Sequence, residues 1–186
     1  MKYKLVAFWL IVFGALFAFL QMCFEYHFYY IEQSQLFLFS EAYIRNKLLL
    51  PGGFSMLVAE FLVQFFIRPY VGALVTAALL TGVGVCTAGI VKRIAPVSGL
   101  FILYVLPMLA LLFMHFDFHY RVQGTVCYLM TMALLCGYMR IRNDLFRLVA
   151  GCVLVPVLFW LAGSITVLFA GMVCLFEGLR LSLIHI

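Results

Sequence analysis

Acidic side chains are scarce in this chain and gather in one stretch. Only seven of the 186 residues are Asp or Glu. The stretch from residue 24 to residue 68 holds four of them: Glu25, Glu32, Glu41 and Glu60. A carboxylate held in place can accept a proton as a general base or bind a metal ion. Glu32 follows several aromatic residues typical of a membrane interface, where a carboxylate needs a cation or several donors to stay ionised.

A second group of ionisable residues lies in one short segment that ends at Arg121. It contains His115, Asp117 and His119, which alternate with phenylalanines. On a strand these three side chains would point the same way and suit zinc or manganese, but on a helix Asp117 would point away. No further ligand is close in the sequence. We therefore predict no metal site and interpret the histidines as interfacial.

Five residues form the predicted site. Glu32 and Asp117 are the candidate catalytic carboxylates, and we expect Glu32 to face Asp117 or Arg121. Arg68 and Arg121 are the candidate substrate-binding cations, because arginine suits a carboxylate or a lipid phosphate. Glu60 is added as a further substrate-binding residue. The sequence indicates no particular cofactor, and motifs such as GxxxxGK[ST] or GxSxG, which mark nucleotide-driven transport or hydrolase chemistry, do not occur.

The elements that must position these residues are long apolar helices. Hydrophobic residues make up 67% of the chain and charged residues only 10%, whereas soluble domains average about a quarter charged. This composition predicts an all-α transmembrane bundle in contact with the lipid bilayer. We do not read the net charge of +5 as a sign of nucleic-acid binding, because the basic residues lie at the ends of the apolar segments. The six transmembrane helices are predicted at residues 5–23, 70–91, 95–114, 122–139, 148–161 and 165–179.

The outer segment, residues 24–69, is predicted to lie outside the cytoplasmic membrane. A short helix is expected from Ser34 to Leu50, ended by Pro51-Gly52-Gly53. Residues 54–67 are too short to span a bilayer. Their polar residues Glu60 and Gln64 recur at helical spacing, which predicts an amphipathic helix parallel to the membrane, with this stripe facing the polar side.

The distribution of basic residues predicts the orientation. Eight of the twelve Lys and Arg residues lie at helix ends that alternate to one side when six helices are counted. Under the positive-inside rule this side is the cytoplasm, so the N-terminus is predicted to be cytoplasmic in a multi-pass protein of the bacterial inner membrane.

The last six residues, 181–186, are predicted to be a non-native tail. Their reading, LSLIHI, resembles a translation of the transposon end used in sequencing-library preparation. We therefore expect the native protein to continue beyond residue 180, as a chain of which this is a C-terminally truncated fragment.

Several short segments of the sequence resemble those of a known but uncharacterised family. Residues 30–39 (YIEQSQLFLF), Pro51-Gly52-Gly53, residues 63–66 (VQFF), 70–73 (YVGA) and 159–164 (FWLAGS) are similar to multi-pass membrane proteins of Bacteroides-type bacteria that carry a domain-of-unknown-function label. The resemblance covers most of residues 24–175. It implies a membrane protein and brings no mechanism.

The order of elements also resembles that of GT-C type glycosyltransferases, in which a first helix precedes an outer loop with an acidic residue. Here Glu32-Gln33 stands where those enzymes carry an Asp or a paired acid. The resemblance implies a polyprenyl-phosphate-linked sugar as donor, with Glu32 activating the acceptor or binding a metal, Asp117 supporting it, and Arg68 or Arg121 holding the phosphate. The alternatives are a transporter or flippase, disfavoured by the few polar residues at mid-membrane depth, and a non-catalytic membrane scaffold.

Overall fold

The structure, a computed structural model, describes residues 2–94 and 101–184, and these residues form helices without any strand. The expected helix at 95–114 is seen from residue 101 onward, and its first part lies outside the described residues, as do residues 185–186 of the predicted tail. The helices are α1 (Lys2–Ser34), α2 (Glu41–Leu48), α3 (Gly53–Val63), η1 (Gln64–Ile67), α4 (Val71–Ile94), α5 (Phe101–Met114), α6 (Val122–Tyr138), α7 (Asp144–Ala162), η2 (Gly163–Ile165) and α8 (Thr166–Ile184).

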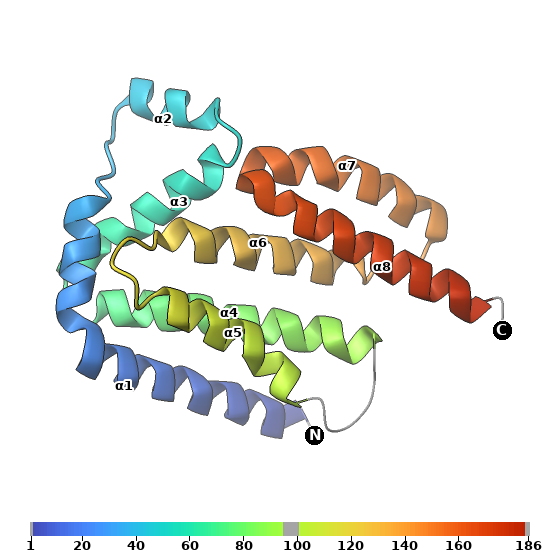
Figure 1. The fold of residues 1–186 in the computed structure, drawn as a ribbon, viewed down its shortest axis with the longest axis horizontal. Coiled ribbons are helices and arrows are strands. Elements are labelled where there is room, and N and C mark those ends of the chain that lie inside the picture. Colours follow the sequence, from blue (N-terminus) through green and yellow to red (C-terminus); the bar gives the residue numbers. More distant parts are fainter. Residues whose placement is uncertain (1, 95–100, 185–186) are drawn as a thin grey trace.

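Helix α4 lies at the centre of the bundle and contacts α1, α5 and α6 (Figure 1). Its small residues allow this close packing, because they let helix backbones approach one another. A Cβ atom added at Gly72 would lie 2.6 Å from the Phe28 ring, and one at Gly84 would lie 2.6 Å from the Trp9 ring. Both glycines are therefore contact points for aromatic side chains of α1.

Helix α1 is longer than expected and bent. Phe24 leaves the helical conformation (φ −129°, ψ 18°), and the helix then resumes to Ser34, running across the end of the bundle (Figure 1). In this second part His27 and Phe28 are buried, and Phe28 packs edge-to-face on Phe66 of η1, with ring centroids 5.5 Å apart. The interfacial aromatics after Cys23 thus belong to a helix that closes the bundle rather than to a loop.

The outer segment forms two short helices joined at a tight corner. The helix expected from Ser34 begins only at Glu41, after an extended segment, because Ser40 caps it by accepting a hydrogen bond from the Tyr43 backbone N–H at 3.3 Å. Gly52 ends the corner with φ +76°, a conformation that favours glycine. The break expected at Pro51-Gly52-Gly53 therefore stands, and α2 folds back over α3.

This corner rests on the hairpin of α7 and α8. The Gly52 N–H donates to the Trp160 carbonyl at 2.9 Å, and the Trp160 indole N–H donates to the Leu48 carbonyl at 2.9 Å. Gly163, at φ +73°, forms the turn of the hairpin. A Cβ at Gly52 would lie 3.2 Å from the Gly163 nitrogen. Two glycine turns distant in sequence therefore meet back to back, with α3 and α7 both packed on α6.

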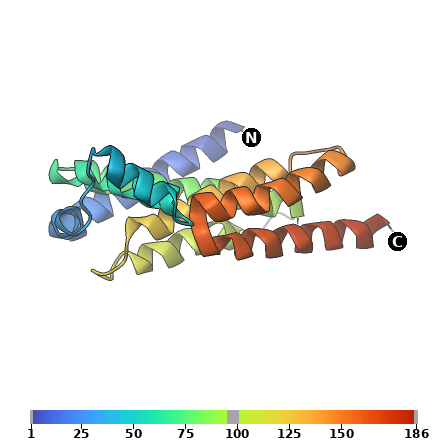
Figure 2. The ribbon, with the colours of Figure 1, turned by 90° about the horizontal axis from the view of Figure 1, so that it is seen from above.

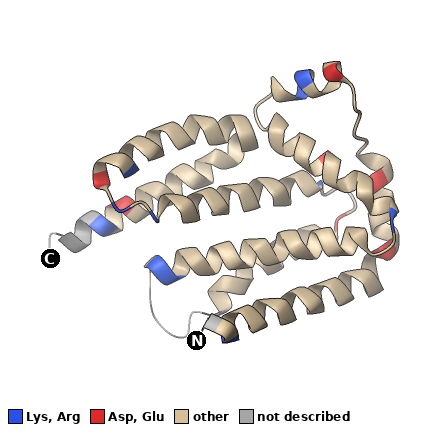
Figure 3. Ribbon diagram, turned by 180° about the vertical axis from the view of Figure 1, so that it is seen from behind, with Lys and Arg blue, Asp and Glu red and all other residues tan. Residues whose placement is uncertain are grey.

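Three segments are long and apolar enough to cross a membrane: Tyr3–Ser34, Val71–Ile94 and Asp144–Arg180. The third folds back at Gly163, so α7 and α8 run in opposite directions (Figures 1 and 2). Two of the six expected spans are shorter over the residues that the structure describes: α5 has 14 residues and α6 has 17. In Figure 3 most Lys and Arg residues lie at the end to which both termini point, and most acids lie at the other end. We call these the basic end and the outer end.

Candidate functional site

A polar cavity of about 250 Å³ lies at the outer end. Its wall comes from the end of α1 and the following segment, from α2, from α3 and from the start of α6. Four separate parts of the chain therefore meet there. The lining residues are Ser34, Gln35, Leu36, Tyr43, Lys47, Met56, Ala59, Glu60, Arg121 and Gln123.

Glu60 is the carboxylate of this cavity and is only 7% exposed. One of its oxygens accepts from the Lys47 ammonium at 2.9 Å, and the other accepts a short hydrogen bond from the Tyr43 hydroxyl. The amphipathic interpretation of residues 54–67 therefore needs correction. The helix is present as α3 and η1, but Glu60 faces α2 instead of water, because α2 folds over it and supplies a cation.

Tyr43 and Lys47 hold this carboxylate from one face of α2, since residues four apart lie on the same side of a helix. Burial raises the pKa of Tyr43 to about 12, and its hydrogen bond to Glu60 adds to the rise. The hydroxyl therefore stays protonated and donates. The Lys47 ammonium also lies 3.1 Å from the Met56 sulfur, and 5.3 Å from the centre of the Tyr43 ring.

Arg121 supplies a second cation to the cavity. It is the N-cap of α6, it is exposed, and its guanidinium has no ion pair or hydrogen bond with any part of the chain that the structure describes. Gln123 beside it donates to the Gly52 carbonyl at 3.4 Å. With Glu60 and Lys47 forming a pair, Arg121 leaves the cavity with an excess positive charge.

The cavity collects two of the five predicted site residues, Glu60 and Arg121. Glu32 lies in the last turn of α1, half-buried, and the structure gives it no pairing with Asp117 or Arg121, contrary to expectation. Asp117 is exposed and accepts from the backbone N–H of its neighbour His119 at 2.9 Å. Its pKa is lowered chiefly by that hydrogen bond.

Arg68 ends η1, is exposed, and does not line the cavity. Sequence reasoning missed Tyr43 and Lys47, the partners of Glu60. The available signal was that Tyr43 and Lys47 lie four residues apart on one short helix, as Met56 and Glu60 do on the next.

The two histidines of the segment that ends at Arg121 lie in different surroundings. His119 is exposed, whereas His115 is 3% exposed and its Nε2 lies 2.9 Å from the Thr125 hydroxyl. Burial, with a smaller effect of nearby His27, lowers the pKa of His115 to about 4. No group of three His, Cys, Asp or Glu residues that could hold a metal occurs in residues 2–94 and 101–184.

A second charged cluster, at the basic end, was not foreseen, because its arginines were interpreted only as markers of orientation. Arg147 is 5% exposed and makes two hydrogen bonds to Glu177, at 2.5 and 3.0 Å. Tyr138 also donates to Glu177, at 2.9 Å. Asp144 bridges Arg147 and Arg180, at 3.1 and 2.5 Å. The cluster joins α6, α7 and α8, and its two arginines are matched by two carboxylates.

Comparison with known protein families gives a match over nearly the whole chain. Residues 1–183 match a family described as "Family of unknown function (DUF6057)". No curated protein and no solved structure matches the chain.

Proposed function

Because the chain belongs to this family of unknown function, its activity has to be inferred from its site, and we propose a membrane enzyme that acts on a phosphate-bearing lipid-linked sugar at the outer cavity. The observation that carries this proposal is the pairing of a buried carboxylate, Glu60, with an uncompensated cation, Arg121, in one cavity. Polar groups that converge in a cavity beside apolar helices are a common form of binding site.

The proposed reaction is transfer of the sugar to an acceptor hydroxyl. Arg121 binds the donor phosphate, for which a guanidinium is suited by its paired donors. The acceptor oxygen attacks the sugar carbon attached to the phosphate, and the carbon–oxygen bond to the phosphate breaks. The lipid phosphate leaves with the bonding electrons, and the acceptor proton passes to Glu60. Tyr43 and Lys47 orient Glu60 for that step.

The proposal includes the position of the protein and its cavity in a membrane. The three membrane-length segments, with the shorter apolar helices packed among them, favour a multi-pass protein. The basic end would face the cytoplasm under the positive-inside rule, and the cavity would then open on the outer side of a bacterial inner membrane. A lipid-linked donor could reach it there from the outer leaflet.

A non-catalytic scaffold is the second candidate, and one observation favours it. Both oxygens of Glu60 already have partners within the chain. On this reading the contacts of Tyr43 and Lys47 serve only to fasten α2 over α3, and the cavity has no substrate.

Glu60→Gln separates the two candidates, because it keeps the shape of the side chain while removing its basicity. The gene would be deleted in its native host, and envelope glycans would be profiled by mass spectrometry after complementation. We expect wild type to restore a sugar missing in the deletion strain, and Glu60→Gln to fail at normal protein abundance. Glu32→Gln, outside the cavity, is the matched control.

Restoration by Glu60→Gln at normal abundance would remove Glu60 from catalysis and favour the scaffold. Failure of Glu32→Gln alone would move the catalytic role to Glu32, as the order of elements in GT-C enzymes implies. An unchanged glycan profile in the deletion strain would contradict the transferase itself.

A further inference from the structure

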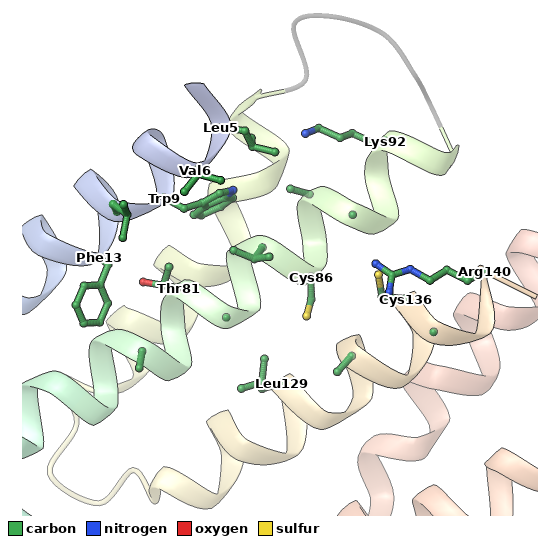
Figure 4. Close-up of a pocket in the computed structure, with 18 residues that line it drawn as sticks. Leu5, Val6, Trp9, Phe13, Thr81, Cys86, Lys92, Leu129, Cys136 and Arg140 are labelled. Atoms are coloured by element: carbon green, nitrogen blue, oxygen red, sulfur yellow. The ribbon is translucent and has the colours of Figure 1, made fainter. Parts of the chain in front are cut away.

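A groove of about 930 Å³ runs along α4 toward the basic end, between α1 and α6 (Figure 4). Its floor is made of small residues of α4, among them Ala78, Gly82 and Gly89. Trp9 of α1 and Leu129 of α6 stand on opposite sides. From Ala78 to Lys92 the floor extends about 21 Å at 1.5 Å per residue, which is longer than half of a hydrocarbon core of about 30 Å.

The groove is apolar along its length and cationic at its end. The described residues that line it include Lys92 and Arg140 and no Asp or Glu. In Figure 4 the Arg140 guanidinium turns toward Cys86 and Cys136, and the Lys92 side chain extends toward Leu5. The Lys92 ammonium lies 5.7 Å from the centre of the Tyr104 ring, and the structure gives Arg140 no carboxylate partner among the described residues.

We propose that this groove is a binding site for an anionic diacyl phospholipid, whose acyl chains lie on α4 and whose phosphate meets Lys92 and Arg140. The volume is at the upper end of the usual range for small-molecule sites, about 300–1,000 Å³. Basic pockets between transmembrane helices at the cytoplasmic side are known to take anionic headgroups. A free phosphate ion would leave the apolar length unused, and a zwitterionic lipid would gain less from two cations.

This site is separate from the outer cavity. It shares no lining residue with the cavity that contains Glu60, and it lies toward the opposite end of the bundle. The lipid proposed here is a bound component of the protein rather than a substrate, so its presence does not depend on the proposed transfer reaction.

Trp9 provides a direct probe, because the chain has only two tryptophans and the other, Trp160, lies on α7. The full chain carrying Trp160→Phe would be reconstituted into phosphatidylcholine vesicles. One set would contain 10% dibrominated phosphatidylglycerol and another 10% dibrominated phosphatidylcholine, and bromine quenching of Trp9 fluorescence would be compared. We expect phosphatidylglycerol to quench several-fold more effectively, whereas equal quenching by the two lipids would overturn the proposal.

Two double variants test whether Lys92 and Arg140 are the source of the preference for phosphatidylglycerol. Lys92→Gln with Arg140→Gln should lower the apparent preference for phosphatidylglycerol about fivefold for each cation removed. Arg93→Gln with Arg142→Gln removes two exposed cations that do not line the groove and is the matched control. An equal loss in the control would show attraction to the basic end as a whole and would overturn the site.

A further variant leaves the charges in place. Ala133 is exposed on the groove wall, so Ala133→Leu should reduce quenching by both brominated lipids. Circular dichroism would confirm helical content in each variant. If the double cation variant does not fold, unchanged phosphatidylglycerol quenching in Ala133→Leu would overturn the proposal by itself.

Discussion

The two charged clusters of the molecule differ in how their charges are balanced. At the basic end, Arg147 and Arg180 face Asp144 and Glu177, and the guanidinium of Arg147 uses its donors on carboxylates and on the Ile141 carbonyl. At the outer end, Glu60 has one cation and one hydroxyl, and Arg121 is left over beside a cavity.

This difference in charge balance has a consequence for what each cluster can bind. A cluster in which each arginine is matched by a carboxylate has no excess charge with which to bind a charged ligand, and removing one partner of its buried ion pair destabilises the fold. A cation with no partner in the chain, at the wall of a cavity, can be neutralised by a ligand. On this difference rests our proposal that the charged cluster at the basic end stabilises the fold and that the outer cavity binds a ligand.

Among the variants that test this proposal, Arg147→Met should have the largest effect on stability. It removes the charge and keeps an apolar stem of similar length, leaving Glu177 without its cation. We expect a loss of about 3 kcal/mol in the free energy of unfolding, at the low end for a broken buried pair because Glu177 is partly exposed. Unfolding would be followed by circular dichroism in detergent. Arg180→Gln, at the rim, should cost less than about 1 kcal/mol, and a larger cost there would break the comparison.

The pH dependence of the free energy of unfolding provides a second test, at the outer end. The folded pKa of His115 is about 4 because of burial, whereas the unfolded value is about 6.5. Between these values the unfolded chain binds a proton that the folded chain does not, so stability is present above pH 6.5 and is lost as the pH falls toward 4. The loss should be on the order of 3 kcal/mol, since one pKa unit corresponds to about 1.4 kcal/mol.

The matched variant for that titration is His115→Gln, which keeps a polar group for Thr125 and removes the titration. The slope of stability against pH should flatten in this variant and should persist in the exposed control His119→Gln. An unchanged slope in His115→Gln would place the pH dependence in another group.

Arg121→Gln should have the smallest effect on stability and a large effect on function. Because the guanidinium is exposed and has no partner in the chain, the free energy of unfolding should change by less than about 0.5 kcal/mol. Complementation of the deletion strain should fail at normal abundance. Full complementation would indicate that the outer cavity, like the charged cluster at the basic end, has only a structural role.

Much of the fold could be predicted from local patterns. Long apolar segments predict helices, because a backbone surrounded by lipid would have to satisfy its own hydrogen bonds. The corner at Pro51-Gly52-Gly53 and the break near Gly163 coincide with glycines at positive φ. The bend at Phe24 and the extended segment before Ser40 were missed, since neither carries a proline or glycine signal.

The candidate site depended on tertiary structure. Helical spacing could show that Glu60 lies on a polar stripe, but not what covers that stripe. Lys47 is 13 residues away from it and Arg121 is farther still along the chain, and they reach one cavity only because Gly52 turns α2 back over α3 while α6 begins beneath it. The composition of the chain by itself determined that its helices are apolar. Which carboxylate acquires a cation, and whether Arg121 meets a carboxylate, was decided by packing between distant segments, because a charge beside apolar helices must find its partner in space rather than in sequence.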